Sequence, residues 1–411
     1  MNQSADGASA PLSAQPSGPD PREARVAALM PELVGVRRDL HMHPELGRQE
    51  QRTTALLVER LEQAGLTARV LPGGTGLICD IVPEGTPADA PLLAFRADID
   101  ALPIDDAKPD TVPYRSTVPG RAHACGHDVH TTVVLGLALV LAEERAAGRL
   151  TRAVRLIFQP AEEIMPGGAL DVIKAGGMER VERIFAVHCD PKVETGRIGL
   201  KVGAITSACD KLEITLDGPG GHTARPHLTT DLVMAIAKLA AELPNALGRR
   251  MDPRWGVSLV WGRIAGGSAA NVIPQSAELE GTVRSLELDG WREAPGAIEE
   301  LVGQIAETYR AKWVIDYHRG VPPVVNEAVS TRMLGDAMER CFGPGRIEGT
   351  EQSLGGEDFS WYLEHAPGAL ARLGVRSPDE TGSRDLHQGT FDADEDAIAV
   401  GVRLFAALAL E

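Results

Sequence analysis

The sequence is poor in cysteine, in positive charge and in long apolar runs, and each shortage excludes a class of protein. Only 5 of its 411 residues are Cys, an odd number at irregular spacing, which excludes a disulfide framework and fits a reduced, cytoplasmic compartment. Lys and Arg number 41 against 58 Asp and Glu, so the clustered positive charge of a nucleic-acid-binding protein is missing. No apolar run reaches the roughly 18 residues of a membrane span, and we expect no membrane partner.

The length of the chain indicates two domains and a terminal tail. A chain of 411 residues is longer than one hydrophobic core usually serves, so two domains are the simplest expectation. Residues 1–20 are rich in Ala, Ser, Pro and Gly and have neither the basic start nor the apolar core of a signal peptide. This composition predicts a disordered tail.

One stretch of eight residues, 123–130, concentrates the metal-binding side chains of the chain. It contains three His, one Cys and one Asp, and Cys125 and His127 are two positions apart, so on loop backbone both can reach one ion. Residues 131–142 are almost all apolar, which predicts a buried helix behind the cluster. A polar turn capping a core helix is the alternative, but a Cys and a His at this spacing beside further His favour a metal site.

Elsewhere in the chain, three apolar runs typical of buried strands lead into acidic or His side chains. Open α/β sheets place their sites beyond the carboxyl ends of such strands, so these side chains are candidates for one composite site. A capped turn at Asp98 and a solvated acidic turn at Glu162 and Glu163 are the alternatives. The candidates are Asp98 after residues 91–97, Glu162 and Glu163 after residues 153–158, and His188 after residues 181–187.

The pattern of polar and apolar residues is different between residues 206 and 320. Polar and apolar residues alternate there, which predicts strands with one solvent-exposed face. The predicted elements follow the order strand, helix, strand, strand, helix, strand. This order suggests a ferredoxin-like α+β insert that interrupts an α/β catalytic domain with a mostly parallel sheet, formed by residues 21–205 and 321–411. The glycines at 218–221 resemble a phosphate loop, but no Gly-Lys-Ser/Thr follows, so a nucleotide-binding transferase is a weak alternative.

Several of these motifs, in this order, resemble the aminoacylase/carboxypeptidase family of dinuclear metallohydrolases. The similarity is to its amidohydrolase branch, which holds indoleacetyl-amino-acid, hippurate and other N-acyl-amino-acid hydrolases, and it spans about residues 26–410. The motifs that carry it are Phe95-Arg96-Ala97-Asp98-Ile99-Asp100-Ala101-Leu102-Pro103, the 123–130 stretch, Gln159-Pro160-Ala161-Glu162-Glu163, Gly221-His222 and Gly355-Gly356-Glu357-Asp358-Phe359.

The resemblance implies a role for individual residues. Glu162 would be the general base, and His222 on a lid and dimerisation domain, often that of the partner subunit, would stabilise the oxyanion. Asn271 and Arg284 would lie near the substrate. The implied metal ligands are Cys125, His127, Glu163, His188 and His387.

Two further residues are assigned by their chemistry and position. Asp98 would orient the imidazole of a metal ligand through its second ring nitrogen. His227, which follows Pro226, would line the lid cleft.

This sequence departs from the wider family at three places. The usual His-x-Asp reads Arg96-Ala97-Asp98, so one ligand is lost there and the pair Cys125 and His127 takes over. Residues 164–166, which follow Glu163, and residues 388–389, which follow His387, also differ. Both of these segments border the substrate pocket, so they bear on the choice of substrate more than on the chemistry.

The predicted function is hydrolysis of the linear C–N amide bond of an N-acyl amino acid or a peptide-like conjugate. Five ligands suit two ions that share a bridge, and a thiolate favours Zn²⁺, although Mn²⁺, Co²⁺ and Ni²⁺ accept the same donors. Arg284 or a neighbouring residue would hold the substrate carboxylate, and the lid would make a homodimer or larger oligomer. The alternatives are a dipeptidase or carboxypeptidase on the same fold, and a non-catalytic metal-dependent binding protein, against which the intact Glu162–Glu163 pair argues.

Overall fold

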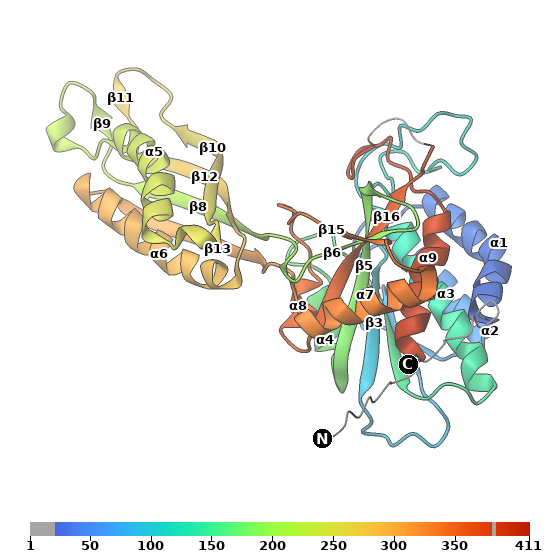
Figure 1. Ribbon diagram of the computed structural model, residues 1–411. Helices are drawn as coiled ribbons and strands as arrows, with labels where there is room; N and C mark the ends of the chain where they lie inside the picture. Colours follow the sequence, from blue (N-terminus) through green and yellow to red (C-terminus); the bar gives the residue numbers. More distant parts are fainter. Residues whose placement is uncertain (1–20, 380–383) are drawn as a thin grey trace, which may run out of the picture.

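The protein consists of two bodies, each with its own sheet and core, that are joined at a narrow waist (Figure 1). The computed structural model describes residues 21–379 and 384–411. The predicted disordered tail, residues 1–20, lies outside the described residues.

The larger body is built on an eight-stranded sheet whose centre is parallel. Strands β4, β3, β5 and β16 run parallel at the centre, and antiparallel pairings join β1, β2 and β6 to them. Every residue of β3 and β4 is buried, as expected of parallel strands covered on both faces. The order across the sheet is β1 (Ala68–Val70), β2 (Leu77–Ile81), β4 (Ala153–Gln159), β3 (Leu92–Asp98), β5 (Val181–Glu194), β16 (Gly368–Arg376), β6 (Ile198–Leu200) and β15 (Ile347–Gly349).

Helices cover both faces of this sheet. Along β3, Leu93, Phe95 and Ala97 belong to one core and Ala94 to the other, since successive side chains of a strand point to opposite faces. The first core packs against α1 (Pro21–Met42), α2 (Gln51–Gln63), α3 (His127–Ala146), α7 (Ala328–Phe342) and α9 (Asp396–Ala409), and the second packs against α4 (Ala169–Lys174) and α8 (Ser360–Leu363). The small pair β7 (Gly203–Ala204) and β14 (Val325–Asn326) lies beside them.

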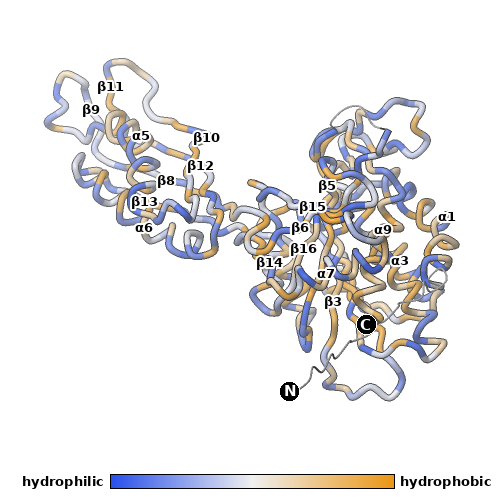
Figure 2. Tube along the Cα trace, viewed as in Figure 1, coloured by the Kyte–Doolittle hydropathy of each residue, from blue (hydrophilic) through white to orange (hydrophobic). Residues whose placement is uncertain are grey.

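Hydropathy follows this layering. The sheet and α3 are mostly apolar, whereas the loops at the ends of the larger body are mostly polar (Figure 2). None of the helices formed by the described residues combines the length and the apolarity that crossing a membrane requires.

The smaller body, which we call the lid, is a ferredoxin-like unit. Its strands pair antiparallel in the order β10, β12, β8, β13. Leu212, Ile214 and Leu216 of β8 are buried in the core beneath the two helices, while the alternate β8 side chains on the other face of the sheet are polar. Its elements are β8 (Ala208–Asp217), β9 (Gly221–His222), α5 (Leu232–Arg250), β10 (Ser258–Gly266), β11 (Val272–Ile273), β12 (Ser276–Ser285), α6 (Leu288–Thr308) and β13 (Lys312–Val321). The predicted fold class is confirmed.

The prediction that a strand ends at His188 is wrong. Strand β5 continues to Glu194 because β16 goes on pairing with it, placing Arg372 opposite His188 and Arg376 opposite Glu194. On its other side, the pairing of β5 with β3 stops at Ala186. His188 therefore lies just past the last β3–β5 pair, level with Asp98 at the end of β3, which still brings it to the edge where the other polar side chains gather.

We expect Gly126→Ala to lower the free energy of unfolding by roughly 2 kcal/mol or more. Gly126 precedes α3 with φ of 85°, and a Cβ there would lie 2.6 Å from the Cys189 sulfur. Gly35→Ala is the control, since Gly35 lies within α1 with nothing within 4 Å of a new Cβ, and it should be neutral or stabilising by up to about 1 kcal/mol. Urea unfolding measures both variants, and equal effects would contradict the expectation.

Candidate metal centre

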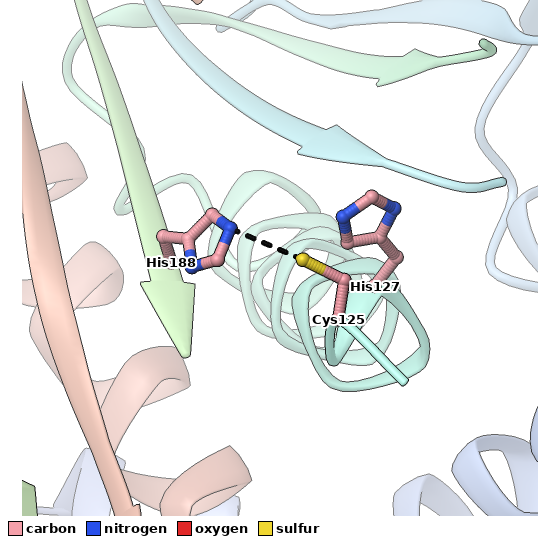
Figure 3. A group of neighbouring side chains, drawn as sticks. All are labelled: Cys125, His127 and His188. Atoms are coloured by element: carbon pink, nitrogen blue, oxygen red, sulfur yellow. Dashed lines mark hydrogen bonds between the residues drawn. The ribbon is translucent and has the colours of Figure 1, made fainter. Parts of the chain in front are cut away.

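Three nitrogen and sulfur donors meet where the N-terminus of α3 faces β5. Cys125 and His127 come from the start of the helix and His188 from the strand, and the Cys125 Sγ is 3.5 Å from the His188 Nε2 (Figure 3). One donor atom from each side chain lies within 4.8 Å of the others, and all three residues are buried. This spacing suits a shared metal ion.

Glu163 and His387 extend the group on the side of Cys125. Donor atoms of Cys125, Glu163 and His387 also lie within 4.8 Å of one another, and the His387 Nε2 is 3.3 Å from the Glu163 Oε1. The structure thus brings all five predicted ligands into one continuous cluster, in which Cys125 belongs to two triads. That each of them binds metal stays a prediction.

The orientations of the His127 and His188 rings leave the Nε2 atom of each free to bind a metal ion. The His127 Nδ1 donates to the backbone carbonyl of Asp100 at 2.9 Å, and the His188 Nδ1 donates to the carbonyl of Cys189 at 2.9 Å. In both rings the Nε2 then carries a lone pair that faces the cluster. Metal-binding His residues are typically oriented through their second nitrogen in this way.

Two buried polar atoms without hydrogen-bond partners in the described part of the chain are evidence that the cluster binds a cation. The His127 Nε2 and the Glu163 Oε1 have no hydrogen-bond partner among the described residues, which is rare for buried polar atoms. Both are electron-pair donors, so they do not satisfy each other, and a divalent cation would satisfy both. The donor set therefore fits a metal.

The charges around the cluster also favour a bound cation. Burial opposes protonation of His127, but the neighbouring carboxylates, Asp98 foremost, together outweigh it and raise the pKa of His127 to about 10, so the cluster attracts positive charge, either a proton or a metal ion that takes its place. Burial, reinforced by Glu163, raises the pKa of the Cys125 thiol well above its usual value, so a thiolate there needs a cation beside it. Burial, with the positive charge of Arg372, holds the pKa of His188 well below its usual range, leaving a neutral imidazole.

Glu162 lies beside the ligands on the segment that follows β4. Its Oε2 is 3.9 Å from the His127 Nε2, and Ala161 before it has φ of 54°, an uncommon conformation for a residue with a side chain. Burial and then the neighbouring Glu357 carboxylate raise the pKa of Glu162 well above its usual value. A carboxyl of raised pKa suits an acid–base role.

Asp98 does not have the contact that we predicted. Its Oδ1 accepts a hydrogen bond from the His130 Nδ1 at 2.6 Å, while the His130 Nε2 accepts from the backbone N–H of Cys189 at 2.8 Å. Asp98 is 3.7 Å from the His127 Nε2, on the side of the ring that faces the cluster. Backbone carbonyls orient His127 and His188 instead, so Asp98 acts on the strand that carries His188 through His130.

Three predicted lid residues lie together but far from the metal cluster. His222 is on β9, Asn271 directly precedes β11, which pairs with β9, and His227 is in the short helical turn η1 (Pro226–Leu228). All three are exposed at the tip of the lid, opposite the body that carries α3 and β5 (Figure 1). Within one chain the structure does not bring them to the cluster.

Arg284 lies at the other end of the lid. Its guanidinium donates to the backbone carbonyl of Leu354, next to the point where the two bodies join. A cleft of about 1030 Å³ opens nearby, between Met165 and Pro166 of the larger body and the open face of the lid sheet, which carries Thr282 and His318.

One group near the cluster was missed by the sequence reasoning. Arg96 is 1% exposed and binds Asp98, Asp358 and Glu357 at 2.6, 2.7 and 3.0 Å. The 355–359 motif was noticed only as part of a resemblance. The available signal was Arg96 itself, because an Arg in an otherwise apolar strand requires buried carboxylates near it.

Comparison with known proteins decides the family. Residues 94–411 match the model of peptidase family M20/M25/M40. The chain belongs to this family. The predicted resemblance to dinuclear metallohydrolases is therefore confirmed.

Individual known proteins match nearly the whole chain. A solved Bacillus subtilis structure, described as a dinuclear metal-binding peptidase of the M20 family, is 34% identical, covers 93% of this chain and 98% of its own, and superposes with a TM-score of 0.81. The N-acetyl-L-cysteine deacetylase of B. subtilis is 35% identical over 91% of this chain and 86% of its own length. A Rhodococcus jostii protein named as a glutamate–cysteine ligase is 47% identical over 92% of this chain, which spans only 46% of that protein's length.

Proposed function

We propose that this protein is a metal-dependent amidohydrolase that cleaves the amide bond of N-acyl amino acids. The observation that carries the proposal is the shared position of Cys125, whose sulfur belongs both to a triad with His127 and His188 and to a triad with Glu163 and His387. Two overlapping triads suit two divalent ions with one bridging ligand. The dinuclear metal of the solved M20 neighbour and the deacetylase activity named for the B. subtilis relative support it.

The protein's own residues would perform the proton transfers. Bound divalent ions, of which Zn²⁺ suits the thiolate best, would polarise the substrate carbonyl and lower the pKa of water. Glu162 would accept a proton from the attacking water and deliver it to the departing amine nitrogen. His222 would donate a hydrogen bond to the oxyanion.

We further propose that residues 206–320 form a lid that works in a homodimer or larger oligomer. His222 lies at the lid tip, so the imidazole at a given cluster would come from the partner subunit. Val260 and Ile264 on the lid edge strand β10 are 63% and 56% exposed, and a partner would cover them. Residues 21–205 and 321–411 would form the catalytic domain, with Arg284, Asn271 and His227 beside the substrate.

A substrate panel tests the proposal. We expect N-acetyl, N-benzoyl and N-indoleacetyl amino acids to be hydrolysed at least about tenfold faster than dipeptides, which carry a free amine. A chelator should abolish the activity and added Zn²⁺ or Mn²⁺ should restore it. Faster hydrolysis of dipeptides would favour the dipeptidase alternative, and no hydrolysis of any member by the metal-loaded protein would favour a binding protein.

A further inference from the structure

The Glu162 carboxylate is buried but unbound. It is 5% exposed, and within residues 21–379 and 384–411 no side chain or backbone N–H donates a hydrogen bond to it. A general base has to stay unbound in this way, because the water that it deprotonates needs its oxygens. Something in the structure must therefore keep competing donors away from Glu162.

The strongest competing donor is the Arg96 guanidinium. It is 1% exposed, and a guanidinium and a carboxylate that meet out of water form a strong charge-assisted pair. In this structure its Nε donates to Gln159 at 2.9 Å and its Nη1 donates to Asp98 at 2.6 Å. Its Nη2 binds Asp358 and Glu357.

Glu357 is the carboxylate that links Arg96 to the surroundings of Glu162. Its Oε1 is 3.0 Å from the Arg96 Nη2 and accepts the backbone N–H of Phe359 at 2.9 Å. Carboxylate oxygens of Glu162, Glu357 and Asp358 all lie within 4.8 Å of one another. Glu162 thus lies beside the two carboxylates that share the Arg96 Nη2, Asp358 at 2.7 Å and Glu357 at 3.0 Å.

Asp358 already binds the Arg96 Nη2 at 2.7 Å, and its other contacts prevent it from taking over the position of Glu357 as well. Its two oxygens also accept hydrogen bonds from the Gln159 Nε2, at 2.9 and 2.7 Å, and from the backbone N–H of Ala169 at 3.0 Å. A Cβ on Gly167 would lie 2.1 Å from its Oδ2, so the backbone holds Asp358 closely in place. The Glu357 Oε2, by contrast, is buried with no partner among the described residues.

We propose that Glu357 is a positioning residue that occupies the Arg96 guanidinium and so keeps Glu162 free to act on water. The proposal rests on the role of Glu162 as general base. It assigns Glu357 no contact with substrate or metal. Its loss should therefore slow the chemical step without weakening the binding of either.

The test compares Glu357→Ala and Glu357→Gln with the exposed control Glu351→Ala in the metal-loaded protein. Glu357→Ala removes an acceptor of Arg96, so the Glu162 side chain should rotate and pair with Arg96. We then expect kcat to fall about 30-fold, because Glu162 loses part of the roughly 10²–10⁴-fold rate contribution of a general base. KM should stay within about twofold and the metal content should match that of the wild type. Glutamine keeps an oxygen for Arg96 and the Phe359 N–H, and it should retain kcat within about threefold, while Glu351→Ala should change neither constant.

A crystal structure of Glu357→Ala should show Glu162 hydrogen-bonded to Arg96. Should the alanine variant not fold, Glu357→Met, which keeps the volume but not the oxygen, provides the same comparison. Unchanged kcat, metal loss in parallel with activity, or a glutamine variant as slow as alanine would overturn the proposal. Full activity of Glu162→Gln would instead overturn the assignment of the base, so the two failures are distinguishable.

Discussion

Replacing Glu162 with Gln should lower kcat by about three orders of magnitude while the metal content stays unchanged. The amide keeps the size of the carboxyl but cannot take a proton from water, and general bases contribute about 10²–10⁴ in rate. Glu162 is an outlying member of the cluster, in contact with His127 at 3.9 Å but absent from both triads that contain Cys125. Steady-state kinetics on an N-acyl amino acid, together with elemental analysis of the same sample, measures both quantities.

The control for this variant is Glu293→Gln on the exposed surface of α6. It makes the same chemical change far from the cluster and should leave kcat as it is. A Glu162→Gln protein that keeps full activity with its metals bound would show that another group accepts the proton, and the proposed mechanism would have to be abandoned.

Removing the sulfur of Cys125 should affect metal binding itself. We expect Cys125→Ala to lose at least one of two bound ions per chain and to be inactive, because Cys125 is the residue that the two triads share. Cys125 itself is 5% exposed, and the alanine methyl group offers no donor in place of the sulfur. Elemental analysis after dialysis against metal-free buffer measures the loss.

Cys79→Ala is the matched control for the cysteine variant. Cys79 is equally buried, on β2, and takes part in none of the metal-binding groups formed by the described residues. It should lose some stability through the small cavity but keep its metal. Equal metal content in Cys125→Ala and the wild type would remove Cys125 from the ligand set and with it the shared bridge.

Much of the fold was predictable because its signals are local. Strand β3 is an apolar run that turns polar only at Arg96 and Asp98, and residues 133–142 of α3 are apolar on every side, as a buried helix is. In the lid, the alternation of Leu212, Ile214 and Leu216 with polar residues marks a sheet with one covered face. Such patterns depend on near neighbours in the chain, so reading them requires no knowledge of the rest of the molecule.

The side chains that form the cluster were predictable for a related reason. Cys125 and His127 are close in sequence, and Glu163 follows an apolar strand whose carboxyl end had to lie at one edge of the sheet. The contacts that these residues make were harder to predict from the sequence. The helix spacing of His127 and His130 does not reveal that Asp98 binds the second of them, nor that the carbonyl of Asp100 orients the first.

The sequence by itself determined the family and the two kinds of sheet, and it pointed to the side chains that gather in the cluster, because motif spacing and hydrophobic periodicity are properties of short segments. Only the tertiary structure decided which side chain each buried charge meets. Arg96 binds Asp358, which is 262 positions away, and no local pattern encodes such a pair. It also decided that His222 lies at the lid tip, since β9 pairs there with β11, about 50 positions further along the chain, outside the main lid sheet.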